Sequence, residues 1–543
     1  MRRDRDIASP LCRQSCSFQN ANKVEVKLPT WLDRRAASLA AESAAFGKIN
    51  PSGARLARVQ FLASAKLTSK LGLRHATNCN EPEEMKKTRV VIAGGGFAGL
   101  YAAKYFDKHL ARRPDVEVTL ISRENFILFT PMLHEVAAGD LSPSDIVNPL
   151  RRILRHVKFV EADVQDVDLN ARKIRCIHGI GDADLELEYD HLLLALGSET
   201  NFFDNQGLRE WAVTMKNVMD ATLLRNRMVA LLEEAALEKD ENTRRELLTF
   251  VTAGGGFAGA DTTGAVNDFL RETARFYPPL REDMIRVVVV HPGSYLLPEL
   301  GEELGRYAER KLIERKVEVI KGARVASYDG SVVELNDGRS IPAATLIWTA
   351  GVRPSPVIAS LPLAKEKNRV RVNENLAVPE ATGLWAVGDC AAVPDSESGQ
   401  FYPPTAQHGL REGVVAAKNI ERTILGQPLK PFRFKTLGLL AAIGHHTGVA
   451  MVFGMKFSGF IAWWLWRSVY LLKLPRLAKK LRVVIAWTLD LFFGRDITQI
   501  ITLRDVEEIS DRLARIRAHR KQAASMATES ALDTSTQTAI TRS

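Results

Sequence analysis

Two identical glycine-rich heptapeptides hold the residues best suited to chemistry. Ala-Gly-Gly-Gly-Phe-Ala-Gly occurs at 93–99 and again at 253–259. In a Gly-x-Gly-x-x-Gly loop the first glycine makes a tight turn, the second lets the backbone approach a pyrophosphate, and the third lets a helix pack closely on a strand. Two such loops predict two bound dinucleotides, with electrons passing from one to the other. The candidate cofactor-binding residues of the loops are Gly94, Gly96, Phe97, Ala98, Gly99, Gly254, Gly256, Phe257, Ala258 and Gly259.

A buried strand must precede such a loop and a helix must follow it. Residues 89–92 and 247–251 are apolar and predict the two strands, while 97–109 and 257–270 have the pattern of helices. The amino-terminal end of each helix would then face the phosphates with its partial positive charge. Both copies therefore satisfy the structural requirement for nucleotide binding.

The residues that would contact the adenosine ribose depart from the usual pattern. The strand after each loop commonly ends at an acid that binds the ribose hydroxyls. Here the strand at 116–121 is followed by Ser122 and Arg123, and the strand at 286–290 by His291. Ser122 can hydrogen-bond a ribose, and Arg123 can lie along the adenine or its phosphates. Without an acid to repel a 2′-phosphate, the choice between NADH and NADPH stays open.

Three further apolar strands, within 189–198, 345–351 and 384–389, complete a design of two nucleotide units. In flavoprotein reductases such strands close each unit and mark the crossings between them. Asp389 ends the third strand, where a carboxylate accepts hydrogen bonds from the ribityl chain of a flavin; its alternative role is a helix cap. The first loop is assigned to FAD because the distant 388–389 segment completes its unit. The remaining candidate contacts are Val164, Ala195, Gly197, Gly351 and Gly388.

From about residue 87 to 505 the chain resembles the type II NADH:quinone oxidoreductases, which are single-subunit, non-pumping respiratory dehydrogenases. The most specific segments are 125–139 (Asn-Phe-Ile-Leu-Phe-Thr-Pro-Met-Leu-His-Glu-Val-Ala-Ala-Gly), 348–352 and 404–413. The resemblance implies a tightly but non-covalently bound FAD and NADH as the hydride donor, with NADPH left open. It also implies that two electrons pass to a membrane quinone without proton pumping, because the flavin carries the chemistry.

The resemblance also implies residues of the quinone site. The family motif is Ala-Gln-x-Ala-x-Gln; Ala406 and Gln407 match it, whereas Gly409 and Arg411 depart from it. An arginine can still hydrogen-bond a quinone carbonyl and favours electron-rich reduced forms. Asp261 stands where the family usually carries a glutamate between the nicotinamide and quinone sites; its alternative role is a first-turn acid favoured by the helix dipole. The expected catalytic residues are thus Asp261, Gln407 and Arg411.

The carboxyl-terminal region is rich in aromatic residues. Two apolar runs, 457–473 and 483–493, flank a basic turn at 473–482, and four of the eight tryptophans lie among them. Neither run reaches the roughly 20 apolar residues of a spanning helix. They predict amphipathic helices in the interface of an anionic membrane. The alternative is an ordinary helix pair for domain packing or for a homodimer. We expect a peripheral protein on the cytoplasmic face of a bacterial inner membrane, or on the mitochondrial inner membrane if the amino-terminal extension is a transit peptide.

Composition and cysteine usage exclude other classes. Of the five cysteines only Cys176 and Cys390 lie in the core, in no redox motif, which disfavours disulfide reductases and sulfide oxidoreductases. The pairs His134-Glu135 and His445-His446 lack the partners of a metal site, so no metal is expected and both pairs are assigned to packing or solvent. The net charge of +10 comes without a basic and aromatic stripe, so no nucleic-acid partner is expected.

The predicted fold is α/β: two Rossmann-like dinucleotide-binding domains, the FAD domain interrupted by the NAD(P)H domain, plus a carboxyl-terminal amphipathic helical membrane-binding region. The expected parts are a basic, disordered extension at 1–86, FAD domain at 87–203 and 351–433, NAD(P)H domain at 204–350, membrane-associating helices at 434–508 and a disordered tail at 509–543. Met85 precedes the first strand closely and is hypothesised to be the true start.

Two other functions compete with the main hypothesis. One is a soluble NAD(P)H-dependent flavoprotein reductase that hands electrons to a protein or a small molecule. The other is a catalytically weak, membrane-attached flavin or NADH sensor. The intact phosphate loops, Asp389 and Gln407 argue against the sensor.

Overall fold

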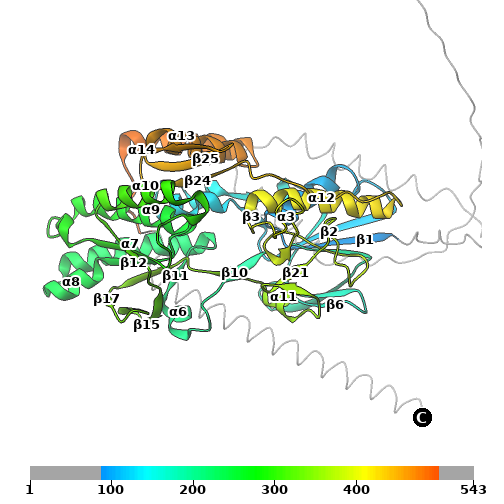
Figure 1. The fold of residues 1–543 in the computed structure, drawn as a ribbon, viewed down its shortest axis with the longest axis horizontal. Helices are drawn as coiled ribbons and strands as arrows, with labels where there is room; N and C mark the ends of the chain where they lie inside the picture. The colour runs from blue at the N-terminus through cyan, green and yellow to red at the C-terminus, as the bar shows by residue number, and fades with distance from the viewer. Residues whose placement is uncertain (1–86, 500–543) are drawn as a thin grey trace, which may run out of the picture. The chain divides into compact units, whose positions relative to one another are not determined.

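The computed structural model describes residues 87–499 (Figure 1). The hypotheses about 1–86, the start at Met85 and the tail at 509–543 lie outside these residues. Two parallel five-stranded sheets with flanking helices dominate the fold, and the predicted architecture of two Rossmann-like units is confirmed. The assignment of domain boundaries stays a prediction.

The first nucleotide unit is built on a sheet with strand order β22-β9-β1-β2-β5. Its strands are β1 (Thr88–Ala93), β2 (Val116–Ser122), β5 (Lys158–Glu161), β9 (His191–Leu194) and β22 (Leu384–Ala386). The apolar residues of β1 (90–93) and β9 (192–194) are all buried, as is usual for parallel strands in a sheet covered by helices. Helix α3 (Phe97–Lys108) follows the first loop and packs against α12 (Ala406–Ile424).

The second nucleotide unit repeats this design with strand order β11-β18-β12-β13-β14. Its strands are β11 (Val213–Thr214), β12 (Thr249–Ala253), β13 (Arg286–His291), β14 (Val317–Lys321) and β18 (Thr345–Trp348). Its helices are α7 (Val218–Leu237), α8 (Glu241–Leu247), α9 (Phe257–Thr273) and α10 (Glu302–Glu314). Helix α9 begins at the second loop, as expected from the sequence.

The chain crosses between the units on two short strands, β10 (Ser198–Thr200) and β19 (Val352–Pro354). The two strands pair antiparallel, with Ser198 opposite Pro354 and Thr200 opposite Val352. Smaller sheets and helices complete the units. They are β3 (Phe126–Leu128) with β4 (Val147–Pro149), β6 (Asp163–Asp168) with β7 (Lys173–His178) and β8 (Ala183–Glu188), β15 (Val325–Tyr328) with β16 (Val332–Leu335) and β17 (Ser340–Pro342), β20 (Lys365–Glu366) with β21 (Arg369–Arg371) and β23 (Ala391–Ala392), and helices α6 (Gln206–Trp211) and α11 (Pro356–Ser360).

The carboxyl-terminal region contains a sheet that the sequence did not predict. Strands β24 (Gly438–Ala442), β25 (Gly448–Val452) and β26 (Met455–Ser458) precede helices α13 (Gly459–Lys473) and α14 (Leu477–Phe493). This region packs on α9 and α10 of the second unit (Figure 1). The turn expected at 473–482 is wrong in its second half, because Pro475 separates the helices and the Lys-, Arg- and Leu-rich stretch after it forms the first turns of α14.

A segment of the first unit lies against the second unit. Helices α4 (Leu133–Ala137) and α5 (Pro143–Ile146) follow β3, and α4 packs on α7 and α9. The buried side chains of residues 129–146 share one apolar core with α7, α9, β24 and the inner faces of α13 and α14. This segment, the second unit and the carboxyl-terminal region therefore form one packed body.

Polar contacts join the carboxyl-terminal helices to α4. Trp487 Nε1 donates a hydrogen bond to Glu135 Oε2 at 2.9 Å, and Arg467 Nη2 lies 3.7 Å from Glu135 Oε1. The Arg467 guanidinium also stacks on the rings of Trp463 and Trp487. All of these groups are buried or nearly so, so the inner side of the helix pair belongs to the protein interior.

Candidate functional site

The two glycine loops have the same backbone geometry. Gly94 and Gly254 adopt φ of +112° and +110°, which only glycine readily takes. The third glycines, Gly99 and Gly259, lie so close to the carbonyl oxygens of Gly94 and Gly254 that a Cβ atom would collide with them. Each loop therefore needs its glycines for the turn and for close helix packing.

The space in front of each loop fits a pyrophosphate. A Cβ atom on Gly96 or Gly256 would meet no protein atom within 4 Å. Gly96 and Gly256 are the N-cap residues of α3 and α9. Neither has a side chain that could accept a hydrogen bond from the first amide groups of its helix. Uncapped amides at a helix start bind phosphate oxygens. The residues present thus fit FAD at the first loop and a pyridine dinucleotide at the second.

The strand ends near the loops carry the expected departures. Ser122 is buried at the end of β2 and faces Gly95, whereas Arg123 is exposed. His291 ends β13, and its Nδ1 accepts a hydrogen bond from the Gly255 amide at 3.1 Å. Burial lowers the pKa of His291, which agrees with a neutral ring that accepts at Nδ1. Neither position offers a carboxylate to the ribose.

The other predicted flavin contacts surround the first loop unevenly. Ala195 directly follows β9, and its carbonyl closes over Gly94. Gly197 lies in the turn before β10, and Gly351 in the turn before β19. Val164 is buried in β6. The structure therefore places Ala195 at the loop itself, Val164 in β6, and the two glycines next to the crossing strands.

Asp389 lies beside this loop in a polar network. Its Oδ2 accepts a hydrogen bond from Ser198 Oγ at 2.7 Å. The preceding Gly388 donates its amide to Glu412 Oε2 at 2.7 Å. Glu412 was not predicted; burial raises its pKa to about 7. The sequence signal for Glu412 was its place within segment 404–413, which carries the family resemblance.

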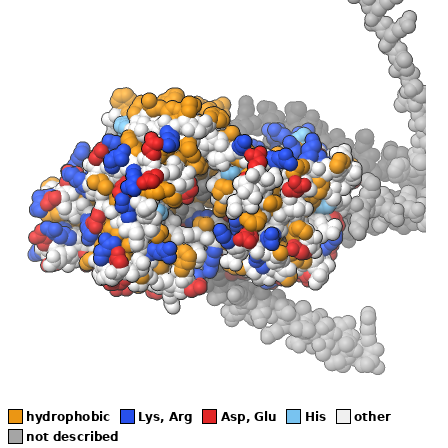
Figure 2. Space-filling view, viewed as in Figure 1, with side chains coloured by type: hydrophobic (Ala, Val, Ile, Leu, Met, Phe, Trp, Pro, Cys, Tyr) orange, Lys and Arg blue, Asp and Glu red, His pale blue; other side chains and the backbone are white. Residues whose placement is uncertain are grey.

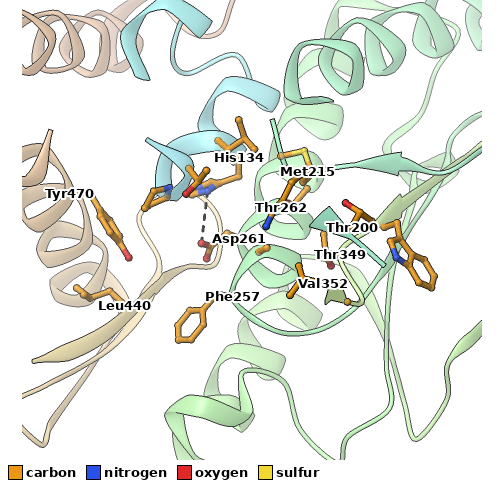
Figure 3. A pocket seen from close by; sticks show the side chains of 17 residues that line it. His134, Thr200, Met215, Phe257, Asp261, Thr262, Thr349, Val352, Leu440 and Tyr470 are labelled. Carbon is orange, nitrogen blue, oxygen red and sulfur yellow. Dashed lines mark ion pairs between the residues drawn. The ribbon is translucent and has the colours of Figure 1, made fainter. Parts of the chain in front are cut away.

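A pocket of about 320 Å³ opens at the start of α9 (Figure 3). It brings together the 130–134 segment, the ends of β10, β11 and β18, the start of α9, and residues of β24 and α13. Its lining residues are Thr130, Pro131, Leu133, His134, Thr200, Met215, Lys216, Phe257, Ala258, Asp261, Thr262, Trp348, Thr349, Gly351, Val352, Leu440 and Tyr470.

Asp261 points into this pocket from the second turn of α9, so the structure does not place it as a first-turn acid. Its Oδ1 accepts the Ala442 amide at 2.9 Å, and its Oδ2 lies 3.9 Å from His134 Nδ1 (Figure 3). Burial raises the pKa of Asp261 well above its usual value and lowers that of His134 to about 3. Burial thus favours the neutral form of both groups. A neutral carboxyl group in such a pocket can supply a proton.

Gln407 and Arg411 lie outside the lining of this pocket. Both are half-buried near the start of α12, which begins at Ala406. Gln407 Nε2 donates to the carbonyl oxygen of Gly438 at 3.4 Å, and the Arg411 guanidinium lies 4.0 Å from the centre of the Phe434 ring. The structure thus brings these two residues to the junction of α12 with β24, apart from Asp261.

Sequence reasoning missed three groups of the pocket. His134, assigned to packing or solvent, lines it, as do Lys216 and Tyr470. A polar residue inside the apolar 129–138 run was the signal for His134. Cys176 and Cys390 are buried and free, and no three His, Cys, Asp or Glu side chains within residues 87–499 are placed to hold a metal ion.

Known protein families match two parts of this chain. The pyridine nucleotide-disulphide oxidoreductase family matches residues 88–413, and the NDH2 C-terminal domain matches 437–496. The type II NADH:quinone oxidoreductase Ndh of Mycobacterium tuberculosis is 30% identical over 462 residues, which cover 82% of this chain and 95% of that protein. The mitochondrial internal alternative NAD(P)H-ubiquinone oxidoreductase A1 of Solanum tuberosum is 28% identical, covering 84% and 97%.

The fold is also that of a solved relative. The structure of NDH2 from Plasmodium falciparum in complex with NADH superposes with a TM-score of 0.70 at 21% identity, covering 76% of this chain and all of that one. The two family matches thus cover both nucleotide units and the carboxyl-terminal region. The chain belongs to the type II NADH:quinone oxidoreductase family.

Proposed function

We propose that this protein oxidises NADH by transferring a hydride to FAD and that the electrons then pass to a membrane quinone. The pocket at the start of α9 carries this proposal, because it joins the second phosphate loop to the first unit and to the carboxyl-terminal region. A nicotinamide bound at the second loop can approach a flavin bound in the first unit where these parts meet.

The chain's own residues would bind, orient and exclude water. The amides at the start of α3 would hold the phosphates of FAD, and Asp389 its ribityl hydroxyl groups; the flavin, when bound, accepts the hydride. The amides at the start of α9 would hold the phosphates of NADH. The apolar walls would exclude water from the nicotinamide, and the Asp261 carboxyl group, whose pKa burial raises, would hold a proton for the acceptor.

Gln407 and Arg411 are proposed to bind the quinone. Their support is their position between the flavin unit and the carboxyl-terminal sheet, with the Gln407 amide already directed at a backbone carbonyl. An amide and a guanidinium are both donors suited to quinone carbonyl oxygens.

The outer face of α13 and α14 is proposed to lie on the membrane. Figure 2 shows the apolar surface along this edge of the molecule. Within the described residues no helix is long and apolar enough to span a bilayer. Exposed large apolar side chains on the two helices include Phe460, Ile461, Trp464, Leu472, Leu477, Leu481, Val484, Ile485, Leu489, Leu491, Phe492 and Phe493. Basic residues at 473–482 suit anionic headgroups, so we place the protein peripherally, on the cytoplasmic face of a bacterial inner membrane.

Purified FAD-loaded protein tests the reaction. NADH oxidation is measured with and without a short-chain quinone, for the wild type and for Asp261→Asn. We expect the quinone to accelerate NADH oxidation in the wild type and the substitution to slow quinone-dependent turnover. Equal rates with and without quinone would instead support a soluble reductase with another acceptor, and negligible turnover with either would support a sensor.

Vesicle sedimentation tests the membrane face. The variant Ile485→Asp/Phe492→Asp alters the helix pair, and Leu237→Asp/Phe276→Asp alters equally exposed apolar residues elsewhere. We expect the wild type and the second variant to sediment with phosphatidylglycerol vesicles and the first variant to remain in the supernatant. A homodimer through this region, our second proposal for the face, is tested by the oligomeric state: a wild-type dimer that the first variant dissociates, with no vesicle binding by either, would contradict membrane docking.

A further inference from the structure

Lys216 brings an ammonium group to the pocket at the start of α9. Three other residues with ionisable side chains line this pocket: burial lowers the pKa of His134 and raises the pKa of Asp261 and of Tyr470, so it favours the neutral form of all three. Among the described residues that form the pocket wall, Lys216 is the one lysine, and no arginine lines the pocket.

The backbone of Lys216 is fixed. The residue lies between β11 and α7, and its amide donates to Asp220 Oδ2 at 2.7 Å. Asp220 also accepts from Thr214 Oγ1 at 2.6 Å and forms a capping box with Asn217 at the start of α7. These bonds fix the point from which the lysine side chain extends.

The side chain reaches across to the first nucleotide unit. Lys216 Nζ donates to Ser198 Oγ at 3.0 Å, and Ser198 Oγ donates in turn to Asp389 Oδ2 at 2.7 Å. The hydroxyl accepts one bond and gives one, so the three groups form a continuous chain. It links the second unit, the crossing strand β10 and the acid proposed to bind the ribityl chain.

We propose that Lys216 is a positioning residue for hydride transfer. Its ammonium group compensates the negative charge that hydride transfer adds to the flavin side of the pocket. The inference rests on the proposed function. Hydride transfer breaks the C–H bond of NADH and moves two electrons and one proton, so the donor becomes NAD⁺ and the flavin side gains one negative charge. An ammonium group held in a pocket with little water stabilises that charge without exchanging a proton.

The link through Ser198 to Asp389 gives Lys216 a second effect. The ammonium group orients the serine hydroxyl toward the carboxylate, so the same residue supports the ribityl contact of the cofactor. Charge compensation and flavin binding can be separated experimentally, because Ser198→Ala breaks the chain while it leaves the ammonium group in the pocket.

The midpoint potential of the bound flavin tests the proposal, measured by spectroelectrochemistry without NADH or quinone. We expect Lys216→Met to disfavour the reduced form about tenfold, a decrease of about 30 mV for a two-electron couple. Lys216→Arg should restore the potential, and Ser198→Ala should keep it while FAD dissociates more readily. Lys239→Met, an exposed lysine of the second unit, is the matched control.

Two results would overturn the inference. One is a wild-type potential in Lys216→Met; the other is a Lys216→Arg potential as low as that of Lys216→Met. If Lys216→Met loses its flavin, Lys216→Gln, which keeps a hydrogen-bond donor without the charge, is measured instead with the same expectation. Because no acceptor is present, failure of the quinone assay would leave this result unaffected.

Discussion

The two glycine loops share one sequence and one conformation, but the helices that follow them pack against different elements. We call these packing elements the covers of the loops. In both, the amide of the first glycine donates to the end of the neighbouring strand, Gly94 to Ile121 O at 2.8 Å and Gly254 to Val290 O at 2.9 Å. Both helices begin without a side-chain cap. The local sequence thus determines the ability to bind a dinucleotide, and it does so equally for both loops.

The covers differ in origin. Helix α12 lies on α3 so closely that Gly413 has no room for a Cβ atom against the Ala98 carbonyl. Strand β24 and the turn after it lie on α9, where a Cβ at Gly264 would meet Gly444 N at 2.6 Å. A buried carboxyl accepts one backbone amide in each case, Glu412 from Gly388 and Asp261 from Ala442.

The covers agree with the unequal roles that we propose for the loops. The α12 cover belongs to the first unit and suits a cofactor that stays bound. The second cover leaves the start of α9 facing a pocket, which suits a substrate that enters and leaves. Identical binding loops can thus serve a resident and an exchanging nucleotide because of residues far away in the sequence.

Matched substitutions at Gly96 and Gly256 should produce the largest effects. Both have φ near −75°, which alanine tolerates, so the methyl group should occupy only the nucleotide's space. Gly96→Ala should yield protein without flavin. Gly256→Ala should keep flavin and raise KM for NADH about a hundredfold, since each lost bond to a charged group costs about 1.5–3 kcal/mol. Absorbance at 450 nm and initial rates distinguish them; flavin loss in both would refute the assignment.

The buried carboxyl groups of Glu412 and Asp261 should make the free energy of unfolding depend on pH. The direction should be opposite to that of acids whose pKa is lowered in the folded protein. Burial raises the pKa of Glu412 from 4.5 to about 7, so the folded protein holds this proton more tightly and the free energy of unfolding falls as pH rises from 4.5 to 7. Glu412→Gln keeps the acceptor for Gly388 and should lose this fall, at most about 3 kcal/mol at about 1.4 kcal/mol per pKa unit.

Urea unfolding at several pH values measures this effect. Asp261→Asn should flatten the curve in the same direction, because burial also raises the pKa of Asp261. Glu210→Gln, at an exposed site, is the control and should follow the wild type. Parallel curves for Glu412→Gln and the wild type would show that Glu412 is not protonated in the folded protein.

Asp389→Ala tests the first site alone. Removal of a charged acceptor for the ribityl hydroxyl groups should weaken FAD binding by about 2 kcal/mol, roughly thirtyfold, and leave KM for NADH unchanged in the loaded enzyme. Flavin fluorescence on dilution measures the release of FAD. Asp204→Ala, at a highly exposed carboxylate, should behave like the wild type; unchanged FAD release in Asp389→Ala would show that the carboxylate does not hold the cofactor.

His291→Asp should have the smallest effect, on nucleotide choice. A carboxylate at the end of β13 can bind ribose hydroxyls and repels a 2′-phosphate. The ratio of kcat/KM for NADH to that for NADPH should rise about tenfold, or 1.4 kcal/mol. Ser122→Asp, at the matching place of the first unit, should leave the ratio unchanged. An equal rise in both variants would contradict the separate roles of the loops.

Local signals predicted the loops with their strands and helices, because turn geometry and apolar runs depend on neighbouring residues. The position of residues 129–146 against the second unit was not predictable in this way, since the packing of α4 depends on α7, α9 and the carboxyl-terminal region. The role of Lys216 was also not predictable from local sequence. The role that we propose for it depends on the hydrogen-bond chain to Ser198 and Asp389, which are 18 and 173 positions away in the sequence.

The paired crossing strands bear on how separable the two units are. Ser198 and Pro354 are partners in one ladder, so the second unit enters and leaves at adjacent points, as an inserted cassette would. Adjacent ends suggest a simple excision in protein engineering. Removal would nevertheless strip the apolar inner faces of α4, α13 and α14, which share the core of that cassette. Excision of the second unit alone should therefore expose this apolar surface and destabilise the rest of the protein.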